Sequence, residues 1–238
     1  MLWTPAILGQ GSKRRSLSDV VVDAVAASQT LVDSASPSFA GVSLGAAADD
    51  RAIYVGVMTN RLVSGGAHTH NAMTVAGVAA RREAQRQTSA GSSHHMTASL
   101  WSAYVPTGTT GSIDITMSDS VENTVIVVYR AINLRTINAW KAYTYTGSNS
   151  FTTNLSVDVP KGGAAICLHM CRNDDGYTFS FNGVTQDYNA EGGDTSEGSG
   201  MWYGSGHAEF SAAQTALAVG VTRNDQIAEL ATLAVSLR

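Results

Sequence analysis

Residues 96–131 limit the fold of this chain more than any other stretch. They read MTASLWSAYVPTGTTGSIDITMSDSVENTVIVVYRA, a pattern typical of three β-strands joined by two short turns. Ile113, Ile115 and Met117 alternate with polar residues, as expected of a strand with one face in a core and one in solvent. Residues 124–130 carry apolar side chains on both faces, which predicts a central, covered strand. The stretch therefore indicates an antiparallel meander in an all-β fold.

Strand patterns recur along most of the chain. Residues 74–87 favour a hairpin turning near Gly77 over a short helix, because no N-cap residue opens the segment. Residues 133–149 and 172–206 are interpreted as irregular, the second with one small hairpin around Asn182 and Gly183. The other expected strands lie at residues 18–26, 29–32, 39–44, 52–58, 151–159, 164–171, 216–222 and 228–237. This spacing predicts an antiparallel β-sandwich, and no period of a propeller or solenoid is present.

The chain has 238 residues and no linker-like break, so we expect one sandwich domain over residues 18–238. Residues 1–17 are apolar in part but aperiodic, which predicts an extended N-terminal arm. Trp3, Ile7 and Leu8 are its candidate partner-binding residues.

Composition and charge exclude several classes of partner. A net charge of −4 gives no general electrostatic reason to bind nucleic acid or acidic lipid. No apolar run is long enough to span a membrane, and no secretory signal pattern opens the sequence, so we expect a soluble, unprocessed chain. Cys167 and Cys171 lie on one expected strand, where residues four apart are roughly 13 Å from each other, too far for a disulfide. Two reduced thiols fit assembly in a reducing cytoplasm.

Two patterns suggest catalysis or metal binding, and both have simpler explanations. Gly41, Ser43 and Gly45 match G-x-S-x-G, but a nucleophile elbow needs a helix after the serine, and a strand follows here. Cys167, His169 and Cys171 would share one strand face, but one strand cannot easily supply three tetrahedral zinc ligands. We expect buried cysteines beside a hydrogen-bonded histidine.

Other polar clusters also receive a structural interpretation. His68, His70, His94 and His95 are expected to be exposed loop residues. The acidic residues of the glycine-rich segment could bind calcium, although their spacing is not that of an EF-hand; they are Asp174, Asp175, Asp187, Glu191, Asp194 and Glu197. We interpret their charge mainly as keeping a long loop soluble, and predict no metal and no cofactor.

Four aromatic residues in the irregular segments are candidate ligand-binding residues: Trp140, Tyr143, Trp202 and Tyr203. Exposed rings of this kind can stack on a sugar, as in a carbohydrate-binding module. They could equally cap the ends of the sandwich or lie in a subunit interface.

The segment SLWSAYVPTGTTGSIDITMSDSVENTVIVVYRA resembles a recurrent pattern in virion proteins of tailed bacteriophages and gene transfer agents. DDRAIYVGVMT and TVAGVAAR fit the same pattern, so the resemblance covers residues 49–131. It implies a jelly-roll-like or immunoglobulin-like sandwich that is a structural or host-contacting part of a virion, with no catalytic residues to carry over.

We therefore expect a non-enzymatic virion component, assembled in the host cytoplasm, that forms a homo-oligomer and docks onto other virion proteins. The first alternative is a carbohydrate-binding module that recognises host-surface glycans. The second is a hydrolase that uses Ser43.

Overall fold

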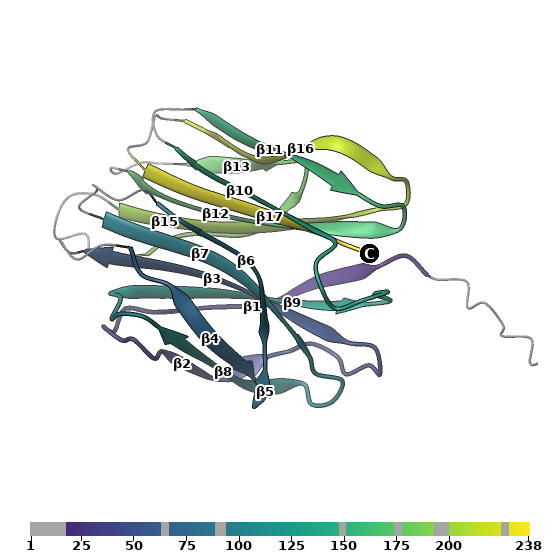
Figure 1. Cartoon of the computed structure of the whole chain (residues 1–238), viewed down its shortest axis with the longest axis horizontal. Helices are drawn as coiled ribbons and strands as arrows, with labels where there is room; N and C mark the ends of the chain where they lie inside the picture. Colours follow the sequence, from purple (N-terminus) through teal and green to yellow (C-terminus); the bar gives the residue numbers. More distant parts are fainter. Residues whose placement is uncertain are drawn as a thin grey trace, which may run out of the picture.

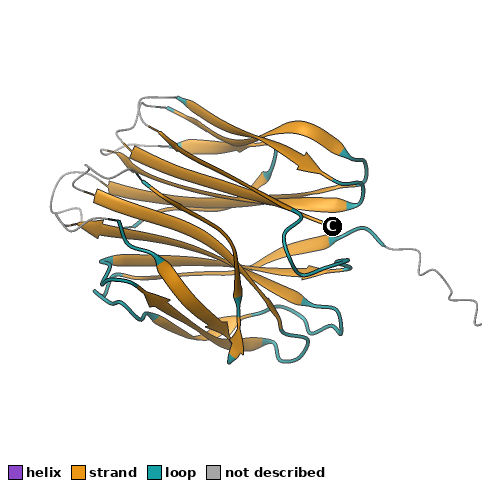
Figure 2. Cartoon of the chain, viewed as in Figure 1, coloured by secondary structure: helices purple, strands orange, loops and turns teal. Residues whose placement is uncertain are grey.

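The computed structural model describes residues 18–62, 67–88, 94–147, 151–173, 178–192, 200–224 and 229–238. All regular structure in these residues is antiparallel β-strand, and none of them is helical (Figure 2). No helix of the described part could therefore cross a membrane. The all-β, sandwich-type, jelly-roll-like prediction is confirmed.

The first half of the chain forms two sheets. The inner N-terminal sheet has the order β1-β9-β3-β7-β6 and the outer N-terminal sheet the order β2-β8-β4-β5. The strands are β1 (Val21–Thr30), β2 (Ser38–Ser43), β3 (Ala52–Leu62), β4 (His70–Val75), β5 (Val78–Ala79), β6 (Arg81–Gln87), β7 (His94–Tyr104), β8 (Thr110–Met117) and β9 (Asn123–Ile132).

The second half repeats this arrangement. The inner C-terminal sheet has the order β10-β17-β12-β15-β14 and the outer C-terminal sheet the order β11-β16-β13. The strands are β10 (Lys141–Gly147), β11 (Thr152–Val159), β12 (Gly163–Asn173), β13 (Phe179–Asn182), β14 (Thr185–Glu191), β15 (Gly200–Phe210), β16 (Gln214–Arg223) and β17 (Glu229–Leu237). If the short β5 is set aside, each strand of the first half has a counterpart at the same place in the second.

The four sheets stack as four layers, outer N-terminal, inner N-terminal, inner C-terminal and outer C-terminal (Figure 1). A buried cluster around Val57 and Ile113 fills the N-terminal sandwich, and one around Val157 and Cys167 lies in the C-terminal sandwich. The largest cluster lies between the two inner sheets and draws residues from both halves. The described strands of both halves therefore share a continuous set of cores. The single-domain boundary itself stays a prediction.

The two halves face each other with approximate two-fold symmetry. β7 of the first half packs against β12 of the second, and the contact that a two-fold axis would generate from it, β15 against β3, is also present. At the centre, Leu168 of β12 fills the space that a side chain at Gly56 of β3 would need, because a Cβ there would lie 2.6 Å from Leu168 Cδ2. This glycine lets the two inner sheets approach closely.

Most of the expected strands and the turn near Gly77 are confirmed, since β4 and β5 pair across that turn. Five expectations are wrong. Residues 96–131 contain three strands but form no meander, because β8 lies in the outer N-terminal sheet while β7 and β9 lie in the inner one. The two strands expected at residues 18–26 and 29–32 are the single strand β1. Residues 133–149 contain β10, and residues 172–206 contain β13, β14 and the start of β15. The chain does turn at Gly183, but β13 pairs with β16 and β14 with β15, so the two strands enter different sheets and form no hairpin.

Candidate functional site

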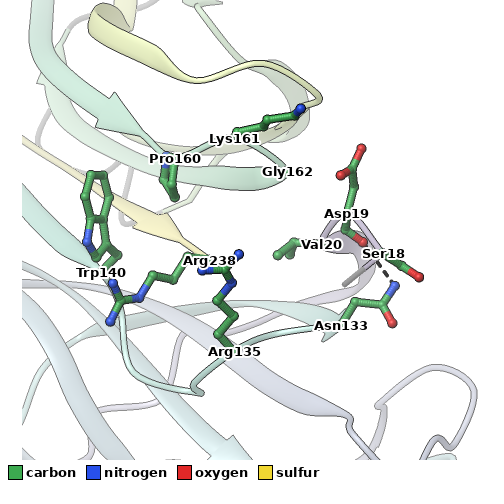
Figure 3. A pocket seen from close by; sticks show the side chains of 10 residues that line it. All are labelled: Ser18, Asp19, Val20, Asn133, Arg135, Trp140, Pro160, Lys161, Gly162 and Arg238. Atoms are coloured by element: carbon green, nitrogen blue, oxygen red, sulfur yellow. Dashed lines mark hydrogen bonds between the residues drawn. The ribbon is translucent and has the colours of Figure 1, made fainter. Parts of the chain in front are cut away.

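A pocket of about 290 Å³ lies where the two halves join. Four segments converge on it: the start of the described chain, the connection from β9 to β10, the turn from β11 to β12, and the last residue (Figure 3). Its lining is Ser18, Asp19, Val20, Asn133, Arg135, Trp140, Pro160, Lys161, Gly162 and Arg238. Pockets at the junction of packed units commonly bind ligands.

Main-chain hydrogen bonds hold these segments together. The N–H of Val20 donates to the carbonyl of Gly162 at 2.8 Å, and the N–H of Arg135 donates to the main-chain oxygen of Arg238 at 2.8 Å. The Asn133 side-chain amide donates to the carbonyl of Asp19 at 3.0 Å. The pocket walls are therefore fixed by the fold and need little ordering when a ligand binds.

Gly162 is required where the first segment meets the β11–β12 turn. Its φ of +71° lies in the left-handed region, and an added Cβ would lie 2.6 Å from the Asp19 carboxylate.

The charged side chains in the pocket are mainly cationic. Arg135, Lys161 and Arg238 are exposed at its surface, and within the described part of the chain none of the three forms an ion pair or a side-chain hydrogen bond. Asp19 supplies the one carboxylate side chain of the lining. In Figure 3, Trp140 and Asp19 stand at opposite rims, with Arg135 and Arg238 between them.

Trp140 forms the aromatic wall. The main-chain N–H of Trp140 donates to the carbonyl of Ser236 at 2.7 Å, which fixes the Trp140 backbone beside β17. The Lys141 ammonium lies 4.8 Å from the centroid of its ring and also pairs with Asp158 at 2.7 Å. The hydrogen bond to Asp158 raises the pKa of Lys141 and lowers that of Asp158, so both stay charged near neutral pH.

This arrangement can bind but offers little for acid–base catalysis. The described lining contains no histidine, cysteine or glutamate, and no nucleophile–base pair. Paired guanidinium groups recognise carboxylate or phosphate, and an indole face stacks on a flat, partly apolar ring.

The other three aromatic candidates lie elsewhere. Tyr143 is on β10 and its hydroxyl accepts the N–H of Asp158, while its ring packs against the core of the C-terminal sandwich. Trp202 and Tyr203 are on β15, not in an irregular segment. Tyr203 is fully buried and Trp202 packs against a small core cluster beside Cys171. Tyr203 therefore cannot stack on a ligand from solution, and the four rings do not form one site.

The two patterns that suggest catalysis or metal binding have structural roles. Ser43 ends β2, and its Oγ accepts the N–H of Gly45 in a turn that leads to β3 with no helix between. Cys167, His169 and Cys171 share the face of β12 that points to the outer C-terminal sheet, as expected. Both cysteines are buried and neither is part of a disulfide, and His169 Nδ1 hydrogen-bonds Thr232 Oγ1 at 2.9 Å.

The expectation of exposed histidines is wrong for the three whose burial is described. His68, His70 and His95 are buried at one end of the N-terminal sandwich. The Thr59 hydroxyl lies 2.6 Å from His68 Nε2 and 2.7 Å from His70 Nε2, and His70 Nδ1 lies 2.6 Å from Ser99 Oγ. Burial lowers the pKa of His68 to about 4 and holds that of His70 well below its usual value, so both rings are neutral.

Of the acidic calcium candidates, the structure describes Asp187 and Glu191. Asp187 pairs with His207 Nδ1 at 2.7 Å and accepts the Tyr129 hydroxyl at 3.1 Å, which links the two inner sheets. The hydrogen bond between Asp187 and His207 raises the pKa of His207. Among the described residues, no group of three or more His, Cys, Asp or Glu is placed to hold a metal ion.

Asp174, Asp175, Asp194 and Glu197 lie outside the described residues, as do the arm residues Trp3, Ile7 and Leu8.

Comparisons of the chain with protein-family models, with curated proteins and with solved structures find no significant match. Function must therefore be argued from the geometry of this chain.

Sequence reasoning found Trp140 but missed the three cations around it. Arg135, Lys161 and Arg238 are scattered in sequence, and only the stacking of the two halves brings them together. The Pro-Lys-Gly-Gly turn at residues 160–163 was the one local signal, because it places Lys161 at the tip of a connection.

Proposed function

We propose that this chain is a non-enzymatic structural component of a phage-like virion that associates with itself and docks onto other virion proteins. The observation that carries the proposal is the stack of two jelly-roll-like sandwiches joined through one shared core. Jelly-roll sandwiches recur in viral shells because their sheets make rigid blocks with loops gathered at both ends. The strand and turn pattern of residues 49–131 supports the same class.

The N-terminal arm is the segment through which we propose that copies associate. The first described residue, Ser18, lies at the surface beside the junction pocket, so residues 1–17 are joined to the described fold at that point. Its apolar residues Trp3, Ile7 and Leu8 are suited to a contact with a neighbouring subunit.

Light scattering coupled to size-exclusion chromatography tests this function. The full chain is expected to form a defined oligomer, and residues 18–238 alone should stay folded but fall to a smaller species. Trp3→Ser, Ile7→Ser and Leu8→Ser combined should reproduce the deletion at full length. A monomeric full chain at high concentration, with no binding to co-produced virion proteins, would overturn the proposal.

The second candidate function is carbohydrate binding, and the position of Trp140 in the junction pocket favours it. Glycan-array binding that Trp140→Ala abolishes would support this function. Trp202→Ala does not test sugar contact, because the Trp202 ring packs against a core cluster and its loss should act through stability.

A further inference from the structure

The charges in the junction pocket point to a particular class of ligand. We propose that the pocket binds a sugar that carries a carboxylate, such as a hexuronic acid, with the ring on Trp140 and the carboxylate on Arg135 and Arg238. This inference rests on the second candidate function, carbohydrate binding, and names its ligand class.

The first argument is the charge left unpaired. Arg135 and Arg238 are linked through a main-chain hydrogen bond, and within the described residues neither guanidinium has an anionic partner. Neighbouring like charges repel each other, and a bound anion removes that repulsion. By contrast, Arg130 of β9 pairs with Asp23 at 2.8 Å.

The second argument is the combination of a flat ring with a planar anion site. A guanidinium binds a carboxylate through two parallel N–H donors, and an indole face accepts the apolar face of a sugar ring. Lys141 already lies over the Trp140 ring, so the sugar would use the remaining face.

The third argument is the match of size and polar partners. A volume of about 290 Å³ is at the small end of ligand pockets and suits one sugar unit rather than an extended polymer. Across the pocket from Trp140, Asp19 can accept hydrogen bonds from sugar hydroxyls, and Lys161 can donate to them.

A matched pair of ligands gives the test. Methyl β-D-glucuronide and methyl β-D-glucoside differ only in a carboxylate against a hydroxymethyl group, so their affinities for the full chain, measured by calorimetry or ligand-observed NMR, isolate the carboxylate. We expect the glucuronide to bind at least about ten-fold more tightly, and to weaken as salt is added.

Variants then assign the contacts. Arg135→Gln and Arg238→Gln should each lower glucuronide affinity about ten-fold and leave glucoside binding unchanged. Trp140→Ala should abolish both, and Trp140→Phe should retain part of each. Arg86→Gln is the matched control, because the Arg86 side chain is exposed and lies on β6 outside the pocket.

Three results would overturn the inference, and they separate it from the function beneath it. Equal binding of the two glycosides would show that the pocket does not recognise the carboxylate, while carbohydrate binding would still be supported. No binding of either would remove both. Inorganic phosphate that binds wild type and Trp140→Ala equally, and displaces the glucuronide, would show a simple anion site without a sugar.

Discussion

Arg51 shows how one side chain can hold a region of loops together. It is fully buried at one end of the N-terminal sandwich, where burial lowers its pKa. Its guanidinium donates to five main-chain carbonyls, at 2.6 to 3.3 Å, those of Leu44, Gly45, Val105, Thr107 and Gly108. Every N–H of the group is therefore used, and two separate connections are joined.

We predict that Arg51→Met destabilises the protein by about 3 kcal/mol or more, because five carbonyls lose a charged donor and become hard to satisfy. Arg51→Lys should recover only part of the loss, since an ammonium cannot reach five acceptors. Urea denaturation measures the change, with the exposed Arg86→Met as control. A change below 1 kcal/mol in Arg51→Met would show that water replaces the guanidinium.

The buried histidines predict loss of stability in mild acid. Folded His68 has a pKa of about 4, and those of His70 and His169 are held well below the usual value by burial. The unfolded chain binds protons near pH 6.5 and the folded chain does not, so stability is full above 6.5 and falls as pH drops towards 4. The free energy of unfolding should fall by up to about 1.4 kcal/mol per pH unit for each such histidine.

Urea midpoints between pH 7 and 5 check this expectation. His207 acts in the opposite sense, because its raised pKa gives stability that is present below pH 6.5 and lost as pH rises through the folded value. His207→Gln should therefore make the acid loss steeper. A flat midpoint over that range in the wild type would contradict burial of neutral His68 and His70.

At the scale of elements, strands with strictly alternating apolar and polar residues could be predicted from the sequence, and glycine-rich strands could not. β11 alternates buried and exposed residues, and β9 is buried along nearly its whole length, both as the sequence predicted. β15 contains Gly200, Gly204 and Gly206, which favour a loop in any local analysis. A Cβ at Gly204 would collide with Phe179 and one at Gly206 with the main chain of Thr185. Gly204 is explained by packing between two layers and Gly206 by the close approach of the neighbouring strand β14, and no local pattern reveals either contact.

Gly220 of β16 gives a test of the same principle. A side chain there would meet the main-chain carbonyl of Thr153 on the neighbouring β11, and a carbonyl in a paired strand cannot move aside. Gly220→Ala should destabilise the protein by about 3 kcal/mol through overpacking. Ala218→Ser, two residues away and exposed, should be neutral by thermal unfolding. Similar midpoints for both variants would show that β11 and β16 separate at little cost.

At the scale of the whole molecule, the candidate site depends on how the two halves stack on each other. Trp140 could be selected from sequence because aromatic residues outside clear strands are few, but its cationic neighbours come from segments that meet only when the halves stack. The equivalence of the halves was also invisible locally, since the shared pattern is one of strand order and not of residue identity. Ala52 and Met58 of β3 lie in the shared core with Ala164 and Met170 of β12, and Gly56 and Leu168 of the same two strands meet there.

The shared core predicts that the two halves unfold together. Leu168 lies at its centre against Gly56, so Leu168→Ala opens a cavity on both inner sheets and should cost about 2 to 5 kcal/mol. Hydrogen exchange should then accelerate equally in β3 of the first half and β12 of the second, with one cooperative transition. Val57→Ala removes a side chain from the N-terminal sandwich alone and serves as the comparison. Loss of protection confined to the C-terminal half in Leu168→Ala would mean that the sandwiches are independent units, and the junction pocket would then lack the fixed walls on which ligand binding depends.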